Sequence, residues 1–262
     1  MEKKTNSRSN FCSRALKGIK TLAGFCLELF FLPPVCLNIQ MSSFLFENSN
    51  DSEDEPNIRI FWESDDLNSK RSMKINISGG KIDENRLKTI MDNAESDSKI
   101  EIIGTEIPPK FRHEKAFSSF KSIEYQDASW VQIEDLYNLR NAKSVKLGAN
   151  NDFTNSEYNM LIEHWLSQEW DMFEKLEIVR YKWVSLRIQW VLSGVDGIVS
   201  TRGGQDVYVF LAKNRENRKN TVGIVYWKKD TFFMETMDPK DYCSLDGGEE
   251  EYNKLLELNK DD

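Results

Sequence analysis

The sequence predicts an α/β fold of irregular, leucine-rich-repeat-like strand–helix units, closed by a C-terminal antiparallel β meander. Three observations favour this class. Five short segments share an apolar–polar–apolar pattern, helical patterns separate them, and β-branched runs in close succession follow Gly194. Because consecutive parallel strands need a crossover, which a helix supplies, this alternation favours a parallel sheet with helices over one face.

The five repeated segments are the first predicted elements. Their period-two alternation is typical of strands with one buried face. Aligned on the first apolar residue, they are spaced by 25, 23, 22 and 31 positions, at Ile75, Ile100, Ile123, Val145 and Leu176. The alternative is an ordinary α+β domain whose strands merely share an amphipathic pattern.

Four stretches between or after these strands place apolar residues at helical spacing: 83–94, 130–140, 155–168 and 185–192. The third is the clearest, with apolar residues at i, i+3, i+4, i+7 and i+8 from Tyr158. Thr154 is expected to cap this helix. Its hydroxyl can accept from the amide of Glu157, whose carboxylate can reach back to the cap.

The chain beyond Gly194 has a different pattern. Residues 206–211, 221–227 and 231–235 are typical of strands around a polar turn, which predicts a meander that caps the repeat sheet. Residues 238–262 hold nine acids and three lysines. They are expected to form a solvated acidic tail with a short helix near its end.

Charge and histidine content limit the chemistry. Residues 1–50 carry a net charge of +3 and the remainder −11, within a total of −8. An acidic body disfavours nucleic-acid binding, because phosphate contacts require Lys and Arg. With only His113 and His164 in the chain, His-based metal sites and catalytic triads are disfavoured as well. We therefore expect no enzyme activity, no cofactor and no metal.

The most apolar stretch, 21–41, follows a basic segment, so a signal peptide or membrane anchor is an alternative to a buried segment. Glu28 and Pro33-Pro34 interrupt it, and a central acid opposes membrane insertion. Cleavage after this stretch would leave Cys243 without an intramolecular partner, and unpaired thiols suit a reducing compartment. We expect an intracellular protein, cytoplasmic or nuclear, with anchoring through 21–41 as the alternative.

Composition also divides the chain. An apolar N-terminal segment is expected over 1–46, an acidic linker over 47–56, the main domain over 57–237 and the tail over 238–262. Gly79-Gly80 and Gly203-Gly204 match no phosphate-loop motif, so turns or bulges are expected there.

A motif lies within 154–166, TNSEYNMLIEHWL. It combines Thr154, an acid at Glu157, Asn159, and the pair His164-Trp165. This pattern resembles the signature of the nematode F-box associated domain, type 2, in which Asp is usual at the position of Glu157. The resemblance covers roughly 57–237 and is strongest over 130–181. The chain departs from the family at 167–169, where a Gly is usual.

Leu176 and Ile178 of the following strand fit the same pattern. We expect all seven motif residues to be structural. Trp165 is expected in the core, and the amide of Asn159 is expected to pair with neighbouring backbone. His164 is expected to be a partly exposed hydrogen-bonding side chain rather than a general base.

The resemblance implies a non-catalytic substrate-recognition component of a cullin-type ubiquitin ligase. In that family an N-terminal F-box binds the S-phase-kinase-associated adaptor. Residues 11–20 look like the end of an F-box, and the ten residues before them cannot supply its earlier helices, so we expect a truncated F-box. The candidate adaptor contacts are Ser13, Arg14, Leu16 and Ile19. An orphan interaction domain that binds no ligase is the alternative.

Overall fold

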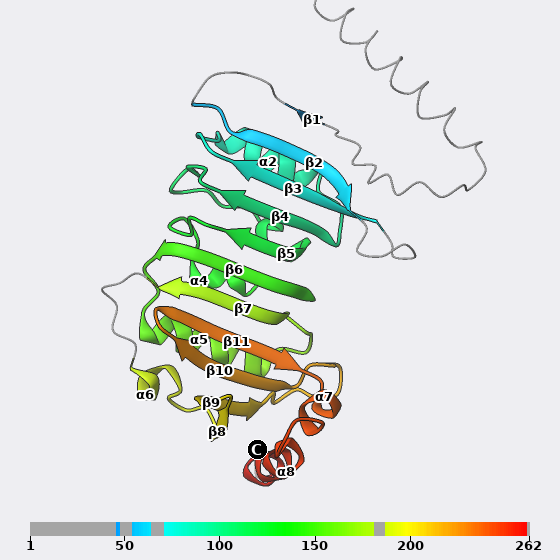
Figure 1. Ribbon diagram of the computed structural model, residues 1–262, viewed down its shortest axis with the longest axis vertical. Helices are drawn as coiled ribbons and strands as arrows, with labels where there is room; N and C mark the ends of the chain where they lie inside the picture. Colours follow the sequence, from blue (N-terminus) through cyan, green and yellow to red (C-terminus); the bar gives the residue numbers. More distant parts are fainter. Residues whose placement is uncertain (1–45, 48–53, 64–70, 181–186, 261–262) are drawn as a thin grey trace, which may run out of the picture. The chain divides into compact units, whose positions relative to one another are not determined.

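Five neighbouring strands of a mixed sheet run parallel in chain order in the computed structural model, which describes residues 46–47, 54–63, 71–180 and 187–260 (Figure 1). The strands are β3 (Ser72–Ser78), β4 (Ser98–Ile103), β5 (Phe120–Tyr125), β6 (Ala142–Asn151) and β7 (Phe173–Arg180).

The register of these strands follows the sequence repeat. Each aligned apolar residue lies directly opposite the next one, so a single buried row crosses the sheet, formed by Ile75, Ile100, Ile123, Val145 and Leu176. A second buried row lies two residues further on, at Ile77, Ile102, Tyr125, Leu147 and Ile178. The five predicted strands are confirmed, and their shared pattern becomes two rows of one core.

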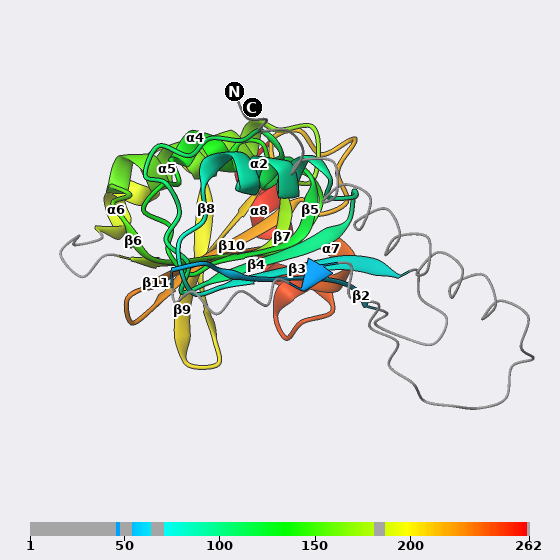
Figure 2. The ribbon, with the colours of Figure 1, turned by 90° about the horizontal axis from the view of Figure 1, so that it is seen from above.

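The helices between these strands cover one face of the sheet, as α2, α4 and α5 show (Figure 2). The crossovers contain α2 (Glu84–Asp92), α3 (Lys115–Ser118), α4 (Ile133–Leu136) and α5 (Asn155–Ser167). The helices predicted over 83–94 and 155–168 are confirmed. The one predicted over 130–140 is reduced to the four residues of α4.

The C-terminal part of the sheet is antiparallel, as expected. It contains β8 (Gly197–Arg202), β9 (Gln205–Leu211), β10 (Val222–Lys228) and β11 (Thr231–Met237), preceded by α6 (Ile188–Val191). The last strand, β11, returns to pair with β7, so β8 forms the far edge. At the opposite edge, β2 (Asn57–Glu63) and β1 (Phe46–Glu47) bring the sheet to eleven strands.

The segment after β11 is not the solvated tail that its acidity suggested. Residues 239–243 form α7 (Pro239–Cys243) and residues 248–258 form α8 (Gly248–Leu258), which includes the short helix expected near the end. Tyr242 and Leu255 are fully buried against Val209 and Ile224 of the sheet. The expectation fails because these two apolar side chains dock both helices on the sheet, while most of the acids, such as Glu249, Glu250 and Glu257, lie exposed on the outer side.

Part of the expected linker is packed. The carbonyl of Asp54 accepts a hydrogen bond from the amide of Lys81 at 2.9 Å, and Pro56 is buried. The four candidate adaptor contacts in the N-terminal segment, Ser13, Arg14, Leu16 and Ile19, lie outside the described residues, as does 21–41. Within the described ranges, no helix is both long enough and apolar enough to cross a membrane.

Candidate interaction surface

One face of the parallel strands carries none of the described helices, and Figure 1 looks onto it. We call it the open face. Between the two buried rows, a polar row crosses this face in register: Asn76, Glu101, Glu124, Lys146 and Glu177. Side chains alternate between the faces of a strand, so these polar residues point away from α2–α5. Parallel sheets normally have both faces covered, which makes a polar open face a departure from the common arrangement.

Ion pairs connect neighbouring strands across the open face. Lys146 Nζ lies 2.8 Å from the carboxylate of Glu124. Two longer pairs flank it, Lys74 with Glu101 at 3.6 Å and Lys175 with Glu235 at 3.9 Å. All of these side chains remain partly exposed. Exposed ion pairs contribute only about 0–1 kcal/mol to stability, so a binding partner could replace them at little cost.

The charge of Lys146 is reinforced by its surroundings. The hydrogen bond to Glu124 raises the pKa of Lys146, and the negative charges of Glu124, Glu177 and Glu101 act in the same direction against its partial burial. Lys146 is therefore a firmly protonated centre among three carboxylates. A partner that binds here would therefore contact positive and negative side chains at neighbouring positions.

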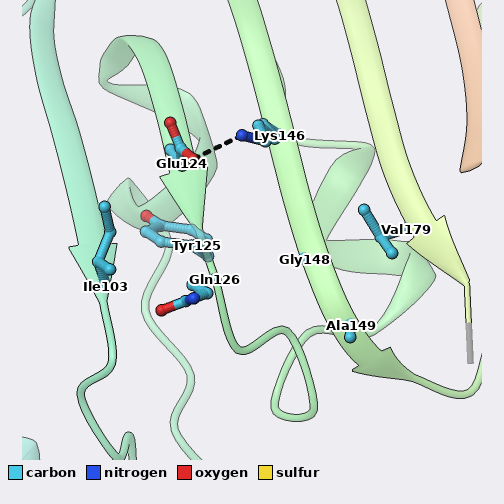
Figure 3. A pocket seen from close by; sticks show the side chains of 8 residues that line it. All are labelled: Ile103, Glu124, Tyr125, Gln126, Lys146, Gly148, Ala149 and Val179. Atoms are coloured by element: carbon cyan, nitrogen blue, oxygen red, sulfur yellow. Dashed lines mark hydrogen bonds and ion pairs between the residues drawn. The ribbon is translucent and has the colours of Figure 1, made fainter.

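A shallow cavity of about 310 Å³ opens at the carboxyl ends of β4–β7 (Figure 3). Ile103 and Val179 flank it from either side, while Glu124 and Lys146 reach across it. Gly148 forms part of its lining, and a Cβ atom there would lie 2.0 Å from the Gln126 carbonyl oxygen. Only glycine therefore allows the backbone at position 148 to lie so close to Gln126. The cavity combines apolar sides with one ion pair, which suits a protruding side chain of a partner.

An aromatic pair extends the open face over β10 and β11. Phe233 lies directly opposite Glu177 of β7. Tyr226 stacks on Phe233 with ring centroids 4.8 Å apart and donates its hydroxyl to Glu235 at 2.8 Å. Burial raises the pKa of Tyr226, and the bond to Glu235 adds to this effect. Partly exposed aromatic side chains are common anchors of protein interfaces.

The motif residues lie elsewhere, on the helical side and in the core. Thr154 and Glu157 form the predicted capping box, with the Thr154 amide donating to the Glu157 carboxylate at 2.7 Å and the Glu157 amide donating back at 3.3 Å. Leu176 and Ile178 are fully buried in β7. The structure does not bring these residues to the open face.

Asn159 and His164 make the contacts expected of them. The Asn159 amide donates to the carbonyls of Val191 and Ser193, at 2.9 Å each, and thereby ties α5 to α6. His164 is partly exposed, and its Nδ1 lies 3.3 Å from the side-chain nitrogen of Gln168. Its ring also stacks on Tyr137 with centroids 4.0 Å apart, and burial lowers its pKa. A neutral ring is favoured at this position, in a packing role.

Trp165 is fully buried beside a residue that sequence analysis missed, Arg218. The Arg218 guanidinium lies 4.2 Å from the Trp165 ring and donates to the Trp165 carbonyl at 2.7 Å. Asp171 lies 3.8 Å from Arg218 Nε. Burial lowers the pKa of Arg218 to about 10. Arg218 sits in the polar turn between β9 and β10, where nothing local distinguishes it from its exposed neighbours.

A second, more open cavity of about 490 Å³ lies between α5 and α6. Neutral side chains line it: Ser156, Asn159, Gln189, Trp190 and Ser193. In the first cavity, by contrast, the charged pair is Glu124 with Lys146, joined at 2.8 Å. In the parts of the chain that are described, no three metal-ligating side chains are grouped closely enough to hold an ion.

Comparison with known proteins adds no relative. No family model matches the chain, and neither a curated protein nor a solved structure matches it. The fold and the candidate surface rest on the residues of this chain alone.

Proposed function

We propose that this protein is a non-catalytic protein–protein interaction module that binds its partner on the open face of the parallel strands. The observation that carries the proposal is a parallel sheet with one polar face that none of the described helices covers. That face offers ion pairs in register, a cavity with apolar sides, and a stacked aromatic pair. Such a surface provides recognition without a reaction centre.

The strand–helix units support a finer proposal, that the domain is built like a leucine-rich repeat. In solenoids of stacked repeats, each unit contacts its neighbours, and the extended sheet face serves for binding. The in-register pattern of β3–β7 fits such stacking, and the antiparallel strands β8–β11 take the place of a terminal cap.

The resemblance of 154–166 to the F-box associated signature supports a specific setting. We place the module as the substrate-recognition component of a cullin-type ubiquitin ligase, or as a descendant of one. In this setting the open face holds the protein substrate. The N-terminal segment, with Ser13, Arg14, Leu16 and Ile19, would contact the S-phase-kinase-associated adaptor.

Affinity capture of the full chain tests both parts. The variant Ser144→Tyr adds bulk at the centre of the open face, where Ser144 lies between Ser122 and Lys175 of the adjacent strands. The matched control is Glu163→Tyr on α5, on the opposite face. We expect quantitative mass spectrometry to show a partner set that the wild type and the control retain and that Ser144→Tyr loses.

The outcomes separate the two claims. Equal capture by both variants would contradict binding on the open face. If partners depend on Ser144 but no adaptor or cullin is recovered, the ligase setting falls and an orphan interaction domain remains. Circular dichroism of both variants must first show an unchanged fold.

A further inference from the structure

The strand β8 ends the sheet, and no described strand pairs with its outer side (Figure 1). Its inner side pairs with β9 over six consecutive positions, from Gly197 opposite Phe210 to Arg202 opposite Gln205, with no bulge. In an antiparallel ladder, alternate residues point their N–H and C=O groups to opposite sides. The outer side of β8 therefore presents a regular row of main-chain donors and acceptors.

The composition of β8 does not protect this edge. Natural edge strands are usually short, bulged, or marked by Pro or by outward Lys. β8 reads GIVSTR, and the Val199 side chain at its centre is 71% exposed. The opposite edge differs, because β1 is only two residues long. An exposed, regular, β-branched edge is a template for another strand.

More apolar surface lies at the same end of the sheet. Helix α6, which leads into β8, lies at this end of the sheet (Figures 1 and 2). It carries Ile188 at 49% exposure and Trp190 at 60%. The end of the molecule that holds the free strand is thus also rich in exposed apolar side chains. Such patches commonly mark interaction sites.

We propose that β8 pairs antiparallel with β8 of a second copy of this chain, on a two-fold axis at Val199. In this register the two Val199 side chains meet, and Gly197 faces Thr201 of the second copy. Asp196 faces Arg202 of the second copy, and the reverse pair forms on the other side of the axis. Registers centred on Ile198 or Ser200 do not bring these opposite charges together.

Two features favour a second copy of this chain as the partner that pairs with β8. The charge pair is self-complementary, since each copy supplies one acid and one base to it. Arg202 is already held by the Glu251 carboxylate at 2.8 Å while 23% of its side chain is exposed. The contact also closes, because an isologous two-fold pair uses both β8 edges, and among the described strands it leaves β1, two residues long, at each outer edge.

Sedimentation velocity of the full chain over a range of concentrations tests the proposal. We expect a monomer–dimer equilibrium for the wild type. Val199→Lys places like charges directly opposite each other and should raise the dimer Kd by about tenfold or more. Met160→Lys, on exposed Met160 of α5, is the matched control and should leave the Kd unchanged. A wild type that stays monomeric, or a Val199→Lys variant that dimerises with the Kd of the wild type, would overturn the proposal.

Disulfide trapping tests the register. Residues opposite each other in an antiparallel pair have Cα atoms about 4.5–5.5 Å apart, which a disulfide can span. In a background with the four native cysteines changed to serine, Val199→Cys should form a covalent dimer on mild oxidation. Thr201→Cys should not, because the two copies of position 201 lie about 13 Å apart. Equal cross-linking at both positions would contradict the two-fold axis at Val199.

Discussion

The parallel and antiparallel parts of the sheet differ in what covers the same face. Over β3–β7 that face is open and polar. Over β8, β9 and the Val222–Ile224 part of β10, the same face lies under α7 and α8. A single row of directly paired residues crosses the border, from Lys175 through Glu235 to Ile224 and Val209. Charged side chains change to apolar ones along this row, at the step from β11 to β10. The change from charged to apolar residues along this row therefore determines where α7 and α8 pack and where the face stays open.

Polar contacts hold the cover in place over the antiparallel part. Glu251 of α8 accepts hydrogen bonds from the Ser200 hydroxyl at 2.5 Å, from Arg202 at 2.8 Å and from the Tyr242 hydroxyl at 2.5 Å. Burial alone would raise the pKa of Glu251, but these hydrogen bonds and the charge of Arg202 together lower it. One carboxylate thus connects β8, α7 and α8. No comparable polar anchor sits above the described part of the open face.

Truncation of Trp165 should have the largest effect, since it removes a large, fully buried side chain of α5 from the main core. We expect Trp165→Ala to lower the free energy of unfolding by about 3–5 kcal/mol, the usual cost of deleting a buried aromatic side chain. Arg218 would lose its ring partner as well. Urea titration followed by circular dichroism measures the change.

The control for Trp165 is Trp190→Ala, which removes a tryptophan that is mostly exposed. Its effect should stay within about 0.5 kcal/mol. An unchanged melting temperature for Trp165→Ala would show that this tryptophan does not support the core.

Truncation of Leu255 tests whether α7 and α8, which cover the antiparallel strands, contribute to the stability of the fold. We expect Leu255→Ala to cost about 3 kcal/mol, because the fully buried side chain would leave a cavity between α8 and β9–β10. Leu258→Ala, at an exposed position of the same helix, should be nearly neutral. If both variants melt like the wild type, α8 does not contribute to the stability of the sheet.

Local patterns explain what the sequence predicts well. Period-two alternation placed β3–β7, and the capping box at Thr154 marked the first residue of α5. The pairing of Ile75 with Ile100, and of Val145 with Leu176, followed from the repeat because parallel strands of one core align their buried residues. The sequence predicts that the amide of Asn159 bonds to a backbone group, since a half-buried amide needs a partner, but it does not identify that group as part of α6.

The failures are non-local. β8 was not predicted, because its own short sequence has no clear strand pattern. It forms a strand by pairing with β9. The acids of 238–262 suggested a free tail, although Tyr242 and Leu255 of this segment pack against Val209 and Ile224, which are distant in the sequence. The burial of Arg218 depends on the end of α5, some fifty residues earlier. The open face itself was not predicted, because alternation indicates which residues face apart but not which face stays uncovered.

The hydroxyl of Tyr242 provides a smaller test of the covered region. Tyr242→Phe removes the bond to Glu251 and should cost about 1.5 kcal/mol at pH 7, since hydrogen bonds to charged groups contribute about 1.5–3 kcal/mol. Burial raises the pKa of Tyr242 to about 12, and the bond to Glu251 adds to this. Unfolded tyrosine titrates near 10.

The sign of the pH effect follows from these values. Between about pH 10 and 12 the unfolded chain has released the Tyr242 proton and the folded chain has not, so stability falls as the pH rises. Urea titrations at pH 8 and at pH 11 should show this loss, and Tyr242→Phe should show less of it. An equal loss in the variant would assign the alkaline sensitivity to other groups.

The smallest effect is expected on the open face, at the pair of Glu124 and Lys146. A double-mutant cycle with Glu124→Gln and Lys146→Met should give a coupling energy below about 1 kcal/mol, because both side chains are partly exposed to water. The covered region contrasts with this, since removing one leucine there should cost about three times as much. A coupling of several kcal/mol would instead mean that the ion pairs hold the parallel strands together, and the open face would then owe its charges to folding rather than to binding.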